Sequence, residues 1–186
     1  MEFQRFTAPD PAALDARIAA QRARLAQALQ AADELAIVDR TADLASLLTT
    51  ARREAEALAL LQGQLDRAAR FSASEVAGWF WNAYATALQY NDLRGEANTA
   101  FAHALALSRR GGWRRLQSFV LQHWGRSLAE QGDLDQAWSK VQKALVIRRE
   151  LNDPRTASTE HALAGLDELR AQQAATAGAN TLPPQP

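Results

Sequence analysis

The stretch GEANTAFAHAL, residues 95–105, recurs in outline 40 residues later as DQAWSKVQKAL, residues 135–145. Both place a small residue, a large apolar residue and then a small and a large residue at the same offsets. Upstream of these stretches, small residues and leucines also recur at 40-residue intervals, and this recurrence extends back into a first unit. Three units in register predict a helical repeat architecture. The matched positions are Ala45, Ala85 and Gly125; Leu48, Leu88 and Leu128; Leu61, Phe101 and Val141; and Leu65, Leu105 and Leu145.

Within each unit the apolar residues follow the i, i+3, i+4, i+7 spacing of an amphipathic helix. Turn residues divide the unit in two: Asn91-Asp92 in the second unit and Gly132-Asp133 in the third. The sequence therefore predicts that each unit is a hairpin of two helices. In the first unit the internal turn would fall near residues 49–52, which contain no glycine. A hairpin and a single helix from about Leu35 to Arg70 are both compatible with that segment.

The flanking segments predict further elements. Asp10 followed by Pro11 is a helix start, which gives an N-terminal helix over residues 10–33 after a flexible stretch, residues 1–9. The repeat domain spans residues 34–172, with units at 34–73, 74–113 and 114–153. A capping helix follows over residues 154–172, begun by Asp153 and Pro154. The polar, proline-containing segment 173–186 is predicted to be disordered.

Composition points to the same fold class. Of the 186 residues, 41 are alanine, the best helix former, and six are proline, so an all-α chain is expected. The absence of cysteine excludes disulfides and thiolate zinc sites and favours a cytoplasmic protein. A formal net charge of zero disfavours general attraction to nucleic acid or to anionic membranes. The sequence contains no run of 18 apolar residues, so no membrane span is predicted.

The second and third units resemble the tetratricopeptide repeat (TPR) family. Trp81, Tyr84-Ala85, Leu88, Ala97, Phe101 and Ala104 occupy that family's pattern, and so do Leu121, Trp124-Gly125, Leu128, Ala137, Val141 and Ala144. The 40-residue period is similar to the long variant of kinesin light chains and of helical sensor regions in bacterial regulators. The sequence departs from the pattern at Gln64 and at Arg109 and Arg149, which stand where the family has alanine and proline.

The resemblance implies a right-handed helical-hairpin solenoid that binds a peptide or a partner's helix in a concave groove. This is a non-enzymatic protein–protein interaction module with an unidentified partner. The groove residues carried over from the family are Trp79, Asn82, Thr86, Gln89, Tyr90, Phe119, Gln122, Arg126 and Glu130. Asn82 is expected to face the groove because it is polar and lies beside Trp81.

Other functions receive less support. His103, His123 and His161 do not have metal-ligand spacing, and the phosphate-binding and nucleophile motifs are absent from the sequence, so we expect no enzyme, no cofactor and no metal. A ligand- or peptide-sensing regulatory module and a self-associating structural protein, forming a homodimer, remain as alternatives. One local patch could hold a phosphate or nucleic acid, although a solvated loop explains it better. Its residues are Arg109, Arg110, Trp113, Arg114 and Arg115.

Overall fold

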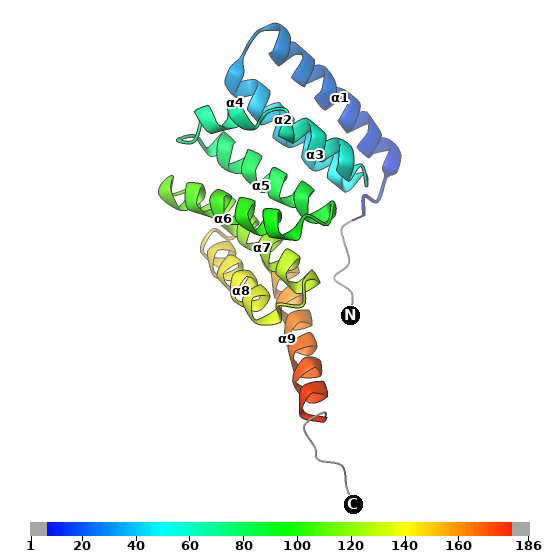
Figure 1. Ribbon diagram of the computed structural model, residues 1–186, viewed down its shortest axis with the longest axis vertical. Coiled ribbons are helices and arrows are strands. Elements are labelled where there is room, and N and C mark those ends of the chain that lie inside the picture. The colour runs from blue at the N-terminus through cyan, green and yellow to red at the C-terminus, as the bar shows by residue number, and fades with distance from the viewer. Residues whose placement is uncertain (1–6, 180–186) are drawn as a thin grey trace, which may run out of the picture. The chain divides into compact units, whose positions relative to one another are not determined.

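The computed structural model describes residues 7–179, and these residues form helices joined by short turns, without any strand (Figure 1). The all-α class predicted from composition and periodicity is therefore confirmed. The helices are α1 (Pro11–Gln30), α2 (Glu34–Thr50), α3 (Glu54–Gln62), α4 (Leu65–Arg70), α5 (Glu75–Tyr90), α6 (Arg94–Arg110), α7 (Arg114–Glu130), α8 (Leu134–Glu150) and α9 (Thr156–Ala179).

The chain divides into two compact units, with the division after Val120. In the N-terminal unit α1 packs on α2, α2 packs on α5, and α5 packs on α6. The short helix α3 contacts both α2 and α5. In the C-terminal unit α8 packs on α9. A core of Leu128, Val141 and Leu166 joins these two helices to the end of α7.

The turns after α1, α2, α5, α6, α7 and α8 share one geometry, and they lie 20 residues apart except between 52 and 92, where residue 72 has no positive φ. Residues 32, 52, 92, 112, 132 and 152 all have a positive φ, between 50° and 82°. After each of them, the next residue's N–H donates to the carbonyl five positions earlier, as Arg53 does to Leu48 at 2.9 Å. This is the Schellman ending of an α-helix, which stops the helix with one residue in the left-handed conformation. Only two of the six residues are glycines, Gly112 and Gly132.

The first repeat is a hairpin with a broken second helix. α2 ends at Thr50 and Arg52 has a φ of 62°, so the alternative of one long helix to Arg70 is wrong. The second half is interrupted at Gly63-Gln64, between α3 and α4. Alanines 104 and 144 are fully buried at the position of Gln64, which is only half-buried. A glutamine does not fit the close helix contact made there, and the break falls at this departure from the repeat.

Both ends show how caps and composition set helix limits. Asp10 accepts a hydrogen bond from the Ala13 N–H at 3.0 Å, and α1 begins at Pro11 as predicted. α9 begins at Thr156 rather than at Pro154, and it continues through Ala179 instead of ending at residue 172. Five alanines between 171 and 179 favour this extension, so the predicted tail is helical as far as Ala179. Residues 1–6 and 180–186 lie outside the described residues.

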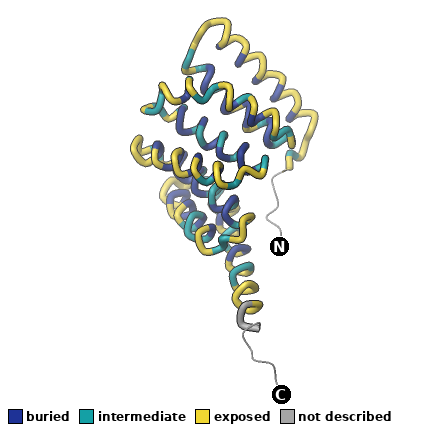
Figure 2. The backbone as a smooth tube through the Cα atoms, in the orientation of Figure 1, coloured by how far each residue is buried: buried dark blue, intermediate teal, exposed yellow. Residues whose placement is uncertain are grey.

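Buried residues recur on the 40-residue register, and Figure 2 shows the burial of the residues along the chain. Positions that match across the three units are buried together, because each contributes the same contact between the two helices of its hairpin or with the neighbouring helix. They are 45, 85 and 125; 48, 88 and 128; 57, 97 and 137; and 61, 101 and 141. The small residues allow the close approach of backbones, and the large ones fill the space beside them. The repeat read from the sequence is thus a repeat of packing.

Candidate functional site

Side chains left at least partly exposed on the first helix of each hairpin form a recurrent stripe. Its second, third and fourth positions lie four, seven and eleven residues after the first, and the set repeats after 40 residues in α2, α5 and α7. Ala83 is the one buried member. The stripe consists of Asp39, Asp43, Ser46 and Thr50; Trp79, Ala83, Thr86 and Tyr90; and Phe119, all in the N-terminal unit. Residues 123, 126 and 130 hold the same register positions within the C-terminal unit.

Two aromatic residues of the stripe are brought together. The rings of Trp79 and Phe119 meet edge to face, with 5.1 Å between their centroids. Both side chains are half-buried, and the Trp79 indole N–H donates to the Glu75 carboxylate at 3.1 Å. The pair is fixed in orientation and still has exposed surface, which suits an anchoring site for an apolar side chain. Thr86 and Tyr90 continue along α5, also half-buried.

Two predicted groove residues are not available for contact. Asn82 is 6% exposed and Gln89 is 1% exposed, so the expectation that these polar side chains face a groove is wrong. Both fall in register with buried residues of α2, Ala42 and Thr49. Packing position therefore overrides polarity. The register could have revealed this, because a residue 40 positions from buried ones is expected to be buried as well.

In the C-terminal unit the predicted residues are engaged locally. Arg126 donates to Glu130 on the same helix at 3.1 Å, with both side chains about one-fifth exposed. The side-chain oxygen of Gln122 accepts from Arg148, 3.4 Å away. Arg148 also donates to the Thr159 hydroxyl and is only 3% exposed. Sequence reasoning missed Arg148, which stands at the buried position occupied by Ala68 and Ser108 in the other units.

These arginines determine the electrostatics around His123. Burial of the imidazole, together with the positive charges of Arg148 and Arg126, lowers the pKa of His123 to about 4. The histidine is therefore neutral at physiological pH. Its charge can appear only under acidic conditions, and it then costs folding free energy.

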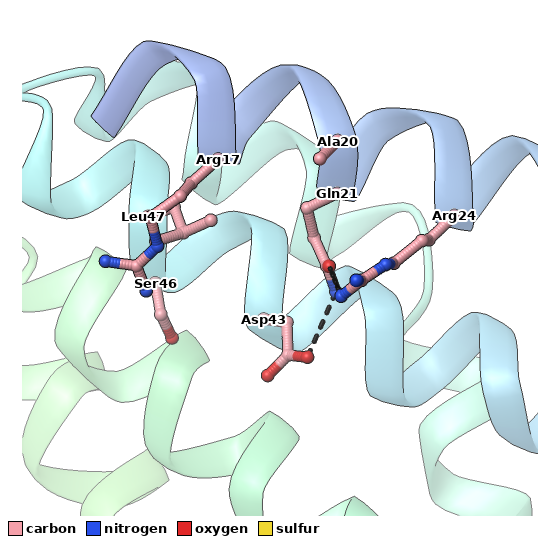
Figure 3. A pocket seen from close by; sticks show the side chains of 7 residues that line it. All are labelled: Arg17, Ala20, Gln21, Arg24, Asp43, Ser46 and Leu47. Carbon is pink, nitrogen blue, oxygen red and sulfur yellow. Dashed lines mark hydrogen bonds between the residues drawn. The ribbon is translucent and has the colours of Figure 1, made fainter. Parts of the chain in front are cut away.

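A cleft between α1 and α2 was not predicted (Figure 3). It has a volume of about 460 Å³ and is bordered by Arg17 and Arg24 of α1 and by Asp43 and Ser46 of α2. At its centre Gln21, 5% exposed, donates to Asp43 at 3.0 Å. Burial, followed by repulsion from Asp39, raises the pKa of Asp43, against the opposing effects of Arg40 and Gln21. No family motif marks this cleft, because α1 lies outside the repeats.

The basic patch is built around a structural tryptophan. A Cβ placed on Gly111 would lie 2.3 Å from the Trp113 ring, and one on Gly78 would lie 3.6 Å from it. The indole thus packs closely against these two glycines, and this face is not open for stacking on a base. Arg110 donates to the Ser72 carbonyl at 2.7 Å, and Arg114 donates to Gln117 at 3.3 Å.

Neither metal-binding groups nor similarity to known proteins points to a function. Within residues 7–179, no group of three histidine, aspartate or glutamate side chains could hold a metal ion. None of the helices described is long and apolar enough to cross a membrane. Comparison of the chain with protein-family models, with curated proteins and with solved structures gave no match. The site must therefore be judged from its own geometry.

Proposed function

We propose that this chain is a non-enzymatic module that binds a peptide segment of another protein along the recurrent stripe. The observation that carries the proposal is the Trp79–Phe119 pair, two half-buried rings from neighbouring hairpins whose centroids lie 5.1 Å apart. Aromatic residues that are rigid and partly exposed are typical anchors of protein interfaces. Thr86 and Tyr90 continue the stripe along α5, so a bound segment would run past their hydroxyl groups.

The proposal includes the finer fold, a TPR-like solenoid of three hairpins with α1 added before them and α9 as the cap. The 20-residue recurrence of left-handed turns and the 40-residue recurrence of burial support it. Hairpins that repeat the same packing stack on their neighbours, and the first helices of such a stack line one surface. A chain without cysteine is compatible with a partner met in the cytoplasm. A crystal structure of the full chain would test the stacking.

Panning of a random dodecapeptide library against the purified chain tests the function. Peptides that are enriched should bind the wild type and lose at least about tenfold in affinity when Trp79 is replaced by alanine. Tyr84→Ala is the matched control, since Tyr84 is also a half-buried aromatic residue of α5 and lies 5.7 Å from the Trp81 ring. It should leave affinity unchanged. Enriched peptides that bind Trp79→Ala as tightly as the wild type, or a library that enriches none, would contradict the proposal.

A further inference from the structure

Arg17 and Arg24 border the α1–α2 cleft without a carboxylate partner. Within residues 7–179, no acidic side chain lies within ion-pair distance of either guanidinium, and Arg24 contacts only the Gln21 amide oxygen, at 3.4 Å. Nearby arginines are paired: Arg22 with Glu56, and Arg40 with Asp39 at 3.3 Å. The cleft therefore has an excess of positive charge at its rim, and both arginine residues are exposed.

Asp43 is the one carboxylate that borders the cleft, and it is held to other groups. Its Oδ2 accepts from Gln21 at 3.0 Å and from Arg40 at 3.5 Å. Because Gln21 is buried and hydrogen-bonded to both Asp43 and Arg24, it holds the exposed carboxylate between the two arginines (Figure 3). A bound anion would be attracted by the two arginines and repelled by Asp43. Removal of the Asp43 charge should strengthen anion binding.

The distance between the two arginines limits which ligands can pair with both of them. Arg17 and Arg24 are seven residues apart on one helix, so their Cα atoms are separated by two turns, or about 10 Å. A segment in the polyproline II conformation has three residues per turn and rises about 3.1 Å per residue. Its side chains three residues apart therefore point the same way at about 9 Å. The cleft volume of about 460 Å³ is within the range of pockets that bind small molecules, which is enough room for a few side chains of such a segment.

We propose that the α1–α2 cleft binds an extended acidic peptide segment whose two carboxylates, three residues apart, pair with Arg17 and Arg24. The guanidinium fork matches a carboxylate, and the Ser46 hydroxyl, which borders the cleft and donates to the Ala42 carbonyl, can accept from the segment's backbone. This inference rests on the proposed function, because Asp43 and Ser46 belong to the recurrent stripe and the cleft extends that surface. A nucleic-acid strand would need several cations along a groove, which two arginines do not supply.

Fluorescence anisotropy of a synthetic peptide tests the inference. The probe is fluorescein-labelled Gly-Gly-Asp-Pro-Pro-Asp-Gly-Gly, measured at low ionic strength, where the Debye length is about 30 Å. The double variant Arg17→Gln/Arg24→Gln should bind the probe at least about tenfold more weakly than the wild type. Asp43→Asn, which retains an acceptor for Gln21, should bind it about threefold more tightly. A probe with asparagine in place of both aspartates should not bind.

The matched control removes the same charge elsewhere. Arg109→Gln/Arg115→Gln also lowers the net charge by two, from exposed positions in the basic patch, and should leave probe affinity unchanged. Equal losses in the two double variants would overturn the inference, since net charge alone would then explain binding. Unchanged affinity in Arg17→Gln/Arg24→Gln would overturn it as well. So would binding of a single-stranded oligonucleotide at the two cleft arginines by a chain that does not bind the probe.

The two proposals fail separately. If library peptides depend on Trp79 while the acidic probe does not depend on Arg17 and Arg24, the cleft assignment is wrong and peptide binding along the stripe survives. If the probe depends on the arginines while the library enriches nothing sensitive to Trp79, the recurrent stripe is not the binding surface and the cleft acts alone. Circular dichroism establishes that each variant is folded, which is expected for substitutions of exposed arginines.

Discussion

Gly125 of α7 and Val141 of α8 pack so closely that a Cβ built on the glycine would lie 2.6 Å from the Val141 Cγ2. The Ala137 carbonyl oxygen would lie 3.0 Å from the same Cβ. Gly125→Ala should therefore lower the free energy of unfolding by about 1–3 kcal/mol, despite the better helix propensity of alanine. Urea denaturation followed by circular dichroism measures the change.

Gly95→Ala is the control for helix propensity, because nothing lies within 4 Å of a Cβ at that position near the start of α6. It should raise stability by roughly 0.5 kcal/mol. The double variant Gly125→Ala/Val141→Ala should show a non-additive recovery, since the methyl group of Val141 causes the clash. If Gly125→Ala and Gly95→Ala raised the free energy of unfolding equally, α7 and α8 would have to move apart at no cost in free energy, which would contradict the prediction.

The left-handed turns give a second prediction. Ala32 and Arg52 have φ values of 51° and 62°, a conformation that costs a residue with a Cβ about 1 kcal/mol. Ala32→Gly and Arg52→Gly should each raise the free energy of unfolding by about 0.5–1 kcal/mol. Differential scanning calorimetry would record an upward shift of the melting temperature.

The reverse change is the control. Gly132→Ala, at a φ of 82° with open space around the Cβ, should lower stability through backbone strain alone. Asp92→Gly should have a smaller effect than Arg52→Gly, because aspartate tolerates the left-handed region better than arginine does. If Ala32→Gly instead lowered the free energy of unfolding, that result would contradict the prediction. The greater flexibility of glycine in the unfolded chain would then outweigh the relief of backbone strain.

Packing periodicity is the part of this fold that sequence can predict. The 40-residue register identified Phe101 and Val141 as equivalent core residues, and both are fully buried. It also located the turns at Asp92 and Gly132, since a helix that presents one apolar face must end where the pattern stops. The sequence does not decide the turn at Arg52, because that turn needs an arginine in the left-handed conformation, which no residue preference indicates.

The binding surface is harder to predict from the sequence, because some polar side chains are buried in the contacts between helices. Asn82 and Gln89 are buried in spite of their amides, and Arg148 is buried where other units have small residues. The α1–α2 cleft depends on which face α1 turns to α2, and that is decided by tertiary packing outside the repeats. Its two arginines are seven residues apart, a spacing that is equally typical of a solvated helix face.

His123 makes the stability of the chain depend on pH. Its pKa is lowered to about 4 in the folded state, against 6.5 as the reference value for a histidine. The unfolded chain therefore takes up a proton first as the pH falls. The contribution of this group is fully present above pH 6.5 and is lost progressively as the pH falls to about 4, by roughly 3 kcal/mol in total.

Urea denaturation of the wild type and of His123→Gln at a series of pH values isolates this contribution. The difference between them should diminish between pH 6.5 and pH 4, as the wild type loses the histidine's share. His161→Gln is the control, since His161 is exposed, and it should follow the wild type throughout. Parallel curves for the wild type and His123→Gln would show that the imidazole ionises freely in the folded protein.

Trp113 supplies the last prediction, which separates a structural role of the basic patch from a binding role. Its ring covers Gly111 and lies beside Gly78, so Trp113→Ala should lower the free energy of unfolding by about 2 kcal/mol. Gly111→Ala should also destabilise, because its Cβ would lie 2.3 Å from the ring. Arg109→Gln/Arg115→Gln removes only exposed charge and should change stability by less than about 0.5 kcal/mol. Stability measurements that left Trp113→Ala equal to the wild type, beside a loss of oligonucleotide binding in that variant, would instead make the indole a stacking platform for a nucleic acid.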